Sequence, residues 1–519
     1  MSAQVVVAPL LVALVTAVLT LAVRGPRSGP TVSLVGVLAY AAAVAALVCR
    51  VLAEGVLVYQ LGDWPAPFGI VLVADALSAF MLALAALVAV AALAFSVRHV
   101  DAYGQRLSYH PLFHMMLVGV SGAFLTGDVF NLFVWFEVML MASYVLVVFY
   151  GGPQHTRAAL RYVVLNLVGS AVMLVAIGGL YATLGTLNMA DMARRLAAPG
   201  QYGVDPAPVL GVSALLFAVF ALKAGLVPFH FWVPGAYRAA PAPVTAMLAG
   251  VVKKVGVYAI VRLYFTVFAA ASLPVSLPGV GGDSTLAFYG PLLFVLATAS
   301  VVVGGVGAVG RDDLEGLFAH SSISQVGFIA LPLAVGATAE GLRAFAVAAA
   351  LVYALNHAVA KGMLFLATGV VADATSTDDL GDLSGLAGRA PVLSGAVFVG
   401  ALAMVGIPPL SGFFGKLLVF DAAVRAGNAA ALGVALAGAL LTVAYMSRGW
   451  NRGFWGAPTP LVDRATPDRV LLALVVALAL AVVAIGVGFD PVFRAATDAG
   501  EAALARGAYV DAVFGGGGG

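Results

Sequence analysis

The chain has 519 residues, of which 62% are hydrophobic and 10% are charged, and its formal net charge is +2. A soluble domain carries roughly a quarter charged residues. This composition, with a mean hydropathy of +1.06, therefore predicts an integral membrane protein and excludes a large soluble domain. The small net charge does not indicate a nucleic-acid partner. The single cysteine, Cys49, excludes an intrachain disulfide and a cysteine-ligated iron–sulfur cluster.

Apolar segments follow one another along the whole chain. Crossing the hydrocarbon takes about 20 apolar residues, and about fourteen runs meet that criterion. The first run has no basic residue before it, so we expect a retained helix and not a cleaved signal peptide. The sequence thus predicts an all-α integral membrane fold. The expected helices cover residues 4–23, 31–53, 70–96, 111–127, 129–150, 159–184, 208–230, 240–268, 286–309, 317–336, 344–371, 391–419, 427–447 and 469–489.

Arginine placement predicts the orientation, because cytoplasmic loops carry an excess of Lys and Arg. Most loop arginines fall in the odd-numbered loops, although Arg194 and Arg195 lie on the other side. We therefore expect the odd-numbered loops in the cytoplasm and both termini on the outer side. The arginines that decide this are Arg24, Arg27, Arg98, Arg106, Arg157, Arg161, Arg448, Arg452, Arg464 and Arg469.

Two apolar segments are interrupted by proline, the seventh at Pro228 and the twelfth at Pro408 and Pro409. They are five helices apart, an odd number, so two units of five helices would sit upside down relative to each other. Paired interruptions at matching positions are typical of inverted-repeat transporters. Unwound backbone at membrane depth is tolerated where it lines a polar cavity. The alternative is a proline kink that serves packing alone.

Lysine occurs only inside apolar runs, at Lys223, Lys253, Lys254, Lys361 and Lys416. A lysine in a dry site can lose its proton, whereas arginine stays protonated. Ionisable groups at membrane depth are expensive and indicate a functional site. The lysines are thus candidate proton carriers. Chance retention in an arginine-biased genome is the alternative, although chance would also place some lysines in loops.

Glu137 is the only glutamate within an apolar core. An unpaired carboxylate there would be protonated, and a nearby lysine would keep it ionised. Lys223 is the expected partner by its depth. Such a pair can gate proton transfer, because a lysine that gives up its proton leaves the carboxylate without its counter-ion. A static salt bridge that fastens two helices is an equally good interpretation.

Further titratable groups extend this series. Lys253 and Lys254 point about 100° apart on one helix, so we expect only Lys254 to face the polar cavity. His320 has hydroxyl neighbours that suit a proton relay, although a lone histidine near a helix start often only packs. His357 and Lys361 are four residues apart and share a helix face, where mutual repulsion favours neutral forms that accept a proton. The polar neighbours of His320 are Ser321, Ser322, Ser324 and Gln325.

These residues form a predicted proton route at membrane depth. No nucleotide-binding loop, nucleophile elbow, zinc motif or pair of haem ligands accompanies them. We therefore expect no cofactor, no metal site and a transporter subunit instead of an enzyme. The members of the route are Glu137, Lys223, Lys254, His320, His357, Lys361 and Lys416.

Six long segments resemble the proton-translocating subunits shared by respiratory complex I, membrane-bound hydrogenases and Mrp-type multisubunit Na⁺/H⁺ antiporters. The resemblance runs from about residue 70 to 450, and GDVFNLFVWFEVMLMASY and GTLNMADMA look most like the D subunit of Mrp antiporters. The six segments read GDVFNLFVWFEVMLMASY, LKAGLVPFHFWVPGAY, APAPVTAMLAGVVKKVGVY, LFAHSSISQVGF, NHAVAKGMLFLATG and GIPPLSGFFGKLLVF.

The resemblance implies fourteen helices, two inverted five-helix repeats, and broken seventh and twelfth helices. The glutamate of the family's fifth helix matches Glu137, and its axial lysines match Lys223, Lys254 and Lys416. The last of these is a glutamate in some members. We expect N-terminal helices over 1–110, repeats over 111–270 and 271–450, and the fourteenth helix and tail over 451–519.

The resemblance also implies Na⁺/H⁺ exchange across the cytoplasmic membrane by a heteromeric complex, so the chain is not expected to transport alone or to bind nucleic acid. One alternative is a proton-pumping subunit of a complex I-like NADH:quinone oxidoreductase or of a membrane-bound hydrogenase. Another is an inactive scaffold, although all the axial charges are retained. The sequence leaves open whether Na⁺ passes through this chain or a partner, because no cage of carboxylates and carbonyls can be recognised.

Overall fold

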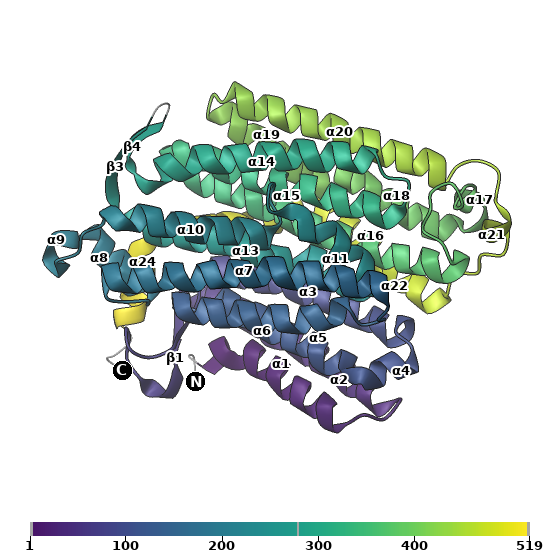
Figure 1. Cartoon of the computed structure of the whole chain (residues 1–519), viewed down its shortest axis with the longest axis horizontal. Coiled ribbons are helices and arrows are strands. Elements are labelled where there is room, and N and C mark those ends of the chain that lie inside the picture. The colour runs from purple at the N-terminus through teal and green to yellow at the C-terminus, as the bar shows by residue number, and fades with distance from the viewer. Residues whose placement is uncertain (1–3, 278–279, 516–519) are drawn as a thin grey trace.

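The computed structural model describes residues 4–277 and 280–515. Long helices lie side by side along the longest axis of the molecule (Figure 1). Twelve stretches of the described chain are long and apolar enough to cross a membrane. They are α1 (Gln4–Ala22), α2 (Ser28–Glu54), α3 (Ala76–His99), α6 (Val129–Val147), α7 (Pro153–Leu184), α10 (Ala207–Ala224), Ala242–Ala270, α14 (Thr285–Val309), α15 (Leu314–Thr338), Glu340–Thr375, α20 (Ala429–Gly453) and α22 (Arg469–Val487).

Two shorter apolar helices, α5 (His110–Leu125) and α18 (Pro391–Val405), bring the crossings in the described chain to fourteen. The predicted all-α membrane fold is therefore confirmed. The crossing Ala242–Ala270 is not uniform, because π-helical turns interrupt its α-helical parts. Its pieces are α12 (Ala242–Met247), η4 (Leu248–Val252), α13 (Lys253–Ile260), η5 (Val261–Val267) and η6 (Phe268–Ala270).

The interior of the bundle is formed by Ala242–Ala270, α15 and α16 (Arg343–Thr375). The apolar window of Ala242–Ala270 is 100% buried and that of α15 is 94% buried, whereas the value is 33% for α2. Peripheral helices such as α2 and α7 expose leucine and valine instead, as a surface in contact with lipid requires. Polar side chains on the central helices are consequently shielded from both water and lipid.

The seventh and twelfth crossings are broken, as the sequence predicted. α10 ends at Gly225, whose φ is 70°, and α18 ends at Gly406, whose φ is 94°. Glycine adopts this left-handed geometry without a steric penalty. Pro228 follows the first break, and Pro408 and Pro409 follow the second. The chain then resumes as η3 (His230–Trp232) and α11 (Val233–Ala239) after the first break, and as α19 (Ser411–Arg425) after the second.

The exposed backbone at the first break is satisfied by neighbouring side chains. The amide of Val227 donates to Ser300 Oγ at 2.9 Å, and Trp232 Nε1 donates to the carbonyl of Leu222 at 2.9 Å. Consecutive crossings alternate in direction, so the two broken helices, five positions apart, run in opposite directions (Figure 1). This is the inverted relation that the sequence predicted.

Two faces terminate the bundle (Figure 1). The hairpin face carries two antiparallel hairpins in which Leu57 pairs with Ala74 and Leu277 with Val280. The arginine-rich face lies at the other end. Elements of the hairpin face are β1 (Leu57–Gln60), η1 (Leu61–Asp63), β2 (Val71–Ala74), α8 (Met189–Ala197), α9 (Pro199–Tyr202), β3 (Ser272–Leu277), β4 (Val280–Ser284) and η7 (Glu340–Leu342). Elements of the arginine-rich face are α4 (Ala102–Gly104), η2 (Gln105–Tyr109), α17 (Leu386–Arg389) and α21 (Pro460–Asp463).

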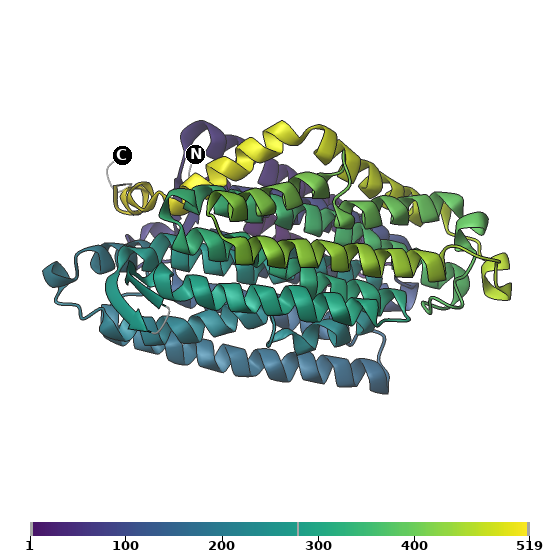
Figure 2. The same cartoon turned by 90° about the horizontal axis from the view of Figure 1, so that it is seen from above.

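The segment after the fourteenth helix, expected only as a tail, forms two further helices in the described chain. Gly488 separates α22 from α23 (Phe489–Leu504), which is followed by α24 (Arg506–Gly515). Figure 2 shows this yellow segment bending and continuing along the flank of the bundle towards the hairpin face. There α24 packs against α8.

Candidate functional site

The first break places a lysine beside the buried glutamate. Lys223 lies in the last turn of α10, and its Nζ is 3.3 Å from Ser170 Oγ on α7. Ser170 in turn donates a short hydrogen bond to Glu137 on α6. No direct ion pair joins Glu137 and Lys223 in the part of the chain that the structure describes. Glu137 and Lys223, which were predicted to interact, are thus connected through the hydroxyl of Ser170, a contact that was not predicted from the sequence.

The centre of the bundle holds a basic cluster around Ser322. Lys254 Nζ lies 2.6 Å from His357 Nδ1 and 2.5 Å from the carbonyl of Ala249. The other ring nitrogen of His357, Nε2, is 3.1 Å from Ser322 Oγ. Lys253, which the sequence set apart, also reaches this cluster, because its Nζ is 3.3 Å from the carbonyl of Ser322.

A second group of hydroxyls surrounds Lys361. Its Nζ donates to Ser321 Oγ at 2.8 Å and to the carbonyl of Phe318 at 3.1 Å. Ser321 donates to the hydroxyl of Tyr445 at 3.0 Å, and Gln325 Nε2 donates to the same hydroxyl at 2.7 Å. Two further hydrogen bonds extend this network, from Gln325 to Thr442 and from Tyr353 to Gln325.

Lys416 lies in α19, just after the second break, whereas Lys223 lies just before the first. Lys416 Nζ donates to the carbonyl of Val405, the last residue of α18, at 3.0 Å. The amine also lies 5.0 Å from the centroid of the Phe328 ring, which packs 5.5 Å from the ring of Tyr353. The Phe328 ring thus lies between Lys416 and Tyr353, which belongs to the hydroxyl network of Lys361.

His320 is separate from these groups. Its ring nitrogens form hydrogen bonds only near the start of α15. Nδ1 lies 2.9 Å from the carbonyl of Gly316, and Nε2 lies 3.1 Å from Arg311 Nη2. The ring is partly exposed near the arginine-rich face. Among its predicted neighbours, Ser321 and Ser322 point instead to Lys361 and His357.

A polar cavity of about 540 Å³ opens on the arginine-rich face. The segments after α14 and α16 pair through a bridge between Asp313 and Asp379, which gathers three carboxyl groups, Asp313, Glu315 and Asp378, beside Arg238. Burial raises the pKa of the Asp378 carboxyl, and the nearby Asp313 carboxylate raises it further. We call this cavity the acidic vestibule. Its lining residues are Gln154, His155, Ala158, Gly235, Arg238, Ala239, Glu315 and Asp378.

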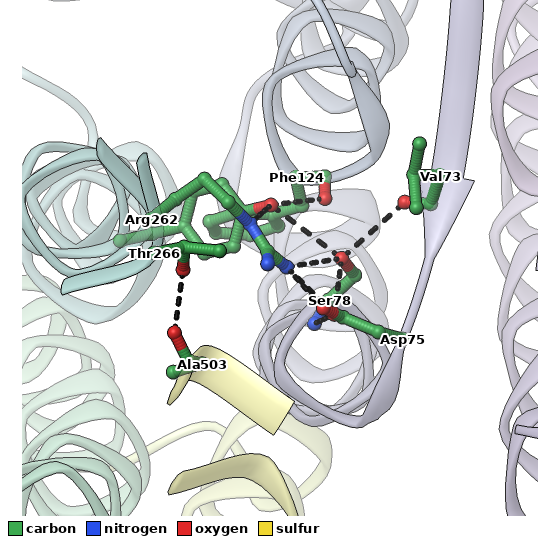
Figure 3. Close-up of polar contacts among 8 residues, drawn as sticks. Val73, Asp75, Ser78, Phe124, Arg262, Thr266 and Ala503 are labelled. Carbon is green, nitrogen blue, oxygen red and sulfur yellow. Dashed lines mark hydrogen bonds and ion pairs between the residues drawn. The ribbon is translucent and has the colours of Figure 1, made fainter. Parts of the chain in front are cut away.

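A buried ion pair lies on the opposite side of the central cluster, towards the hairpin face (Figure 3). Arg262 Nη2 donates to both oxygens of Asp75 at 2.7 and 2.6 Å, and both side chains are at most 2% exposed. This pair was not predicted from the sequence. Its signal was an arginine inside the apolar run VYAIVRLYFTV, whereas the other arginines were expected in loops.

Geometry limits the charge that the central cluster can hold. Lys254 and His357 are 2.6 Å apart in a dry interior, so both cannot be cations at once. One of them must be neutral and able to accept a proton. Serine and tyrosine hydroxyls connect the amines, and hydroxyls both donate and accept. The arrangement can therefore bind and pass protons, and no group of three metal-ligating side chains occurs among the described residues.

Comparison with known proteins gives the family. Residues 126–442 match the family described as "NADH:quinone oxidoreductase/Mrp antiporter, TM". The D subunit of the Na⁺/H⁺ antiporter of Alkalihalophilus pseudofirmus is 36% identical over 89% of each chain. The chain belongs to this family.

Solved structures agree with this assignment. A chain of the Mrp complex from Dietzia sp. DQ12-45-1b superposes with a TM-score of 0.87 at 29% identity and covers 99% of both chains. A chain of an archaeal membrane-bound sulfane sulfur reductase superposes with a TM-score of 0.88 at 28% identity, also over 99% of both chains. The whole described fold, including the C-terminal helices, is therefore shared with subunits of larger membrane complexes.

Proposed function

We propose that the chain is a subunit of a heteromeric Na⁺/H⁺ antiporter of the cytoplasmic membrane and that it conducts protons along its buried polar residues. The observation that carries this proposal is the presence of three buried polar groups between the two broken helices. The first joins Glu137 through Ser170 to Lys223, the second contains Lys254 and His357, and the third connects Lys361 with hydroxyls, while Lys416 lies at the second break. Relatives named as the D subunit of Na⁺/H⁺ antiporters support the same function.

The mechanism follows from mutual exclusion of charge. A proton that arrives on Lys254 or His357 displaces the charge of its neighbour, since the two cannot both be cations in a dry site. The displaced charge changes the protonation equilibrium of the amines of Lys361 and Lys223. Loss of the proton from Lys223 leaves Glu137 without a counter-ion, so that carboxylate takes up a proton through Ser170. Proton movement at one broken helix is thereby coupled to proton movement at the other.

The acidic vestibule is the proposed place of proton uptake. Burial and the nearby Asp313 carboxylate raise the pKa of the Asp378 carboxyl there, so this group can hold a proton. Glu315 and Ser322 are seven residues apart on one face of α15, which connects the vestibule with the central cluster. The buried hydroxyl of Tyr237 lies near Ser322 but makes no geometrically complete hydrogen bond in the described chain, and its ring centroid lies 5.9 Å from Lys253 Nζ. A bound water would satisfy that hydroxyl.

The arginines support an orientation with the arginine-rich face in the cytoplasm. Most arginines on the hairpin side pair with a carboxylate at most four residues away, as in Arg50 with Glu54 and Arg425 with Asp421, although Arg506 does not do so among the described residues. Arg24, Arg106 and Arg157 on the other face have no such partner in the described chain. Arginines near the helix ends are also more frequent on this face than on the hairpin face, and such an excess favours the cytoplasmic side. Both termini would then face outward, and the two inverted units would cover residues 111–270 and 271–450.

A test of the function is Lys223→Arg. Arginine keeps the charge but does not release a proton, so we expect Na⁺/H⁺ exchange to be lost while the complex still assembles. Exchange is measured as Na⁺-dependent fluorescence recovery in everted vesicles, and assembly is measured by co-purification of the partner subunits. Exchange at the wild-type rate by an assembled Lys223→Arg complex would contradict the proposal.

The second candidate is a proton-pumping subunit of a redox complex. The superposition on a chain of the sulfane sulfur reductase, a respiratory complex, favours it. Purification with native partners separates the two candidates, because small antiporter subunits or iron–sulfur subunits would co-purify in the respective cases.

A further inference from the structure

The ion pair of Asp75 and Arg262 lies at the end of a polar stripe that begins at the central cluster. Lys254, Tyr258 and Arg262 follow one another at four-residue intervals on the same crossing, so they share one helix face. The hydroxyl of Tyr258 lies 3.3 Å from Arg262 Nε and 3.4 Å from Ser78 Oγ. The stripe therefore leads from a titratable amine straight towards the hairpin face.

The chemistry of the pair differs from that of the lysines. A guanidinium carries only donors and is not deprotonated in proteins. Asp75 has both oxygens engaged, since Oδ1 accepts from the Ser78 amide at 2.9 Å and from Ser78 Oγ at 3.0 Å, while Arg262 binds both oxygens (Figure 3). Neither partner can accept a proton without breaking this arrangement.

The C-terminal helices cover the pair from the hairpin face. Tyr509 of α24 lies over the guanidinium, with its ring centroid 4.9 Å from the Arg262 Cζ. One turn further along, Thr266 donates to the carbonyl of Ala503 at 2.6 Å. Asp75, Arg262 and Tyr509 are all at most 2% exposed. The pair is thus buried and is covered on its hairpin side by the C-terminal helices.

We propose that the Asp75–Arg262 pair is a proton barrier, which closes the hairpin side of the central cluster and directs protons along the membrane plane instead of straight across. This inference rests on the proposed function, because a barrier matters only where Lys254 carries protons. It identifies Arg262 as a residue that determines coupling. This buried arginine stands where a titratable lysine would continue the relay.

The test is Arg262→Lys in the purified complex reconstituted into liposomes. Lysine keeps the positive charge but can release its proton. A potassium diffusion potential is imposed in the absence of Na⁺, and a trapped pH dye reports passive proton influx. We expect the variant to admit protons several-fold faster than the wild type. The matched control is Arg50→Lys at an exposed salt bridge with Glu54, which should leave the passive influx unchanged.

Two further variants separate a barrier from a purely structural role. Tyr258→Phe removes the hydroxyl between Lys254 and position 262, so adding it to Arg262→Lys should restore low proton influx. The double variant Asp75→Asn, Arg262→Gln replaces both charged groups by uncharged, non-titrating amides, and its passive proton influx should stay as low as that of the wild type. Wild-type influx in assembled Arg262→Lys, or a leak that Tyr258→Phe does not suppress, overturns the proposal. Because the assay needs no Na⁺ exchange, a complex without exchange activity would disprove the proposed function and leave this result interpretable.

Discussion

Ser170 shows how a small side chain can control a charged one. The hydroxyl receives a hydrogen bond from Lys223 and donates one to Glu137, so the carboxylate and the amine are coupled without touching. A direct ion pair in a dry interior would hold both charges tightly. Separation by one hydroxyl leaves the amine able to release its proton while the carboxylate keeps a donor.

This geometry predicts the behaviour of Ser170→Ala. Loss of one hydrogen bond to a charged group costs about 1.5–3 kcal/mol, so we expect the exchange rate to fall at least about tenfold. Ser170→Thr, which keeps the hydroxyl, should retain most of the activity. Exchange is measured in everted vesicles at matched amounts of assembled complex. An alanine variant as active as the threonine variant would show that Glu137 and Lys223 do not communicate through this position.

At the scale of elements, the first break depends on close contact between two helices. Gly256 of α13 packs against the end of α10, where a Cβ would lie 2.6 Å from the Ala224 amide nitrogen and 2.8 Å from the Phe220 carbonyl oxygen. These are backbone atoms and cannot move aside independently. The absence of a side chain at Gly256 therefore sets the distance between the helix that carries Lys254 and the break that carries Lys223.

Gly256→Ala should consequently destabilise the complex by about 1–3 kcal/mol and displace Lys223. Gly178→Ala is the matched control, because Gly178 also lies inside a helix but a Cβ there meets nothing within 4 Å. That change should be neutral or stabilising by up to about 1 kcal/mol. Thermal unfolding of the purified complex distinguishes the two, and equal midpoints would refute the packing argument.

At the scale of the whole molecule, the two faces differ in how their arginines are neutralised. Most arginines of the hairpin side are paired locally, whereas the opposite face has more arginines, several of them without an ion-pair partner in the described chain, around an acidic vestibule. The vestibule would therefore be a negative site on a positive surface. This contrast is what supports the proposed orientation.

Labelling of single cysteines tests that orientation. In a Cys49→Ser background, Gly200→Cys lies on the hairpin face and Gly388→Cys on the arginine-rich face, and both positions are exposed and uncrowded. We expect a membrane-impermeant maleimide to label the first variant in intact cells and the second only after the membrane is opened. The reverse pattern would place the vestibule outside.

Much of the fold could be predicted because apolar length and proline breaks are local signals. Fourteen crossings and the broken seventh and twelfth helices were expected from runs of leucine, valine and alanine and from Pro228, Pro408 and Pro409. The hairpins were not, since Val71–Ala74 is as apolar as the helix that follows it. The ordered α23 and α24 were also missed, because alanine-rich turns at a chain end resemble a tail.

The site could be predicted in its residue types but not in its contacts. Depth along a helix suggested that Glu137 and Lys223 interact, yet the intervening Ser170 comes from a third helix, and no local pattern reports such a contact. Spacing also separated Lys253 from Lys254, although long flexible side chains bring both amines to the environment of Ser322. Arg262 and Asp75 are 187 residues apart, so their pairing depends on tertiary structure alone.

The position of Tyr509 has a consequence for the order of synthesis. Asp75 and Arg262 leave the ribosome before α24 does, yet their cover on the hairpin face comes from α24. Until α24 is made and docked, the nascent chain therefore presents this pair uncovered on that face. A chain truncated before α24 would keep the polar patch exposed, and a membrane protease could recognise the truncated chain by that patch.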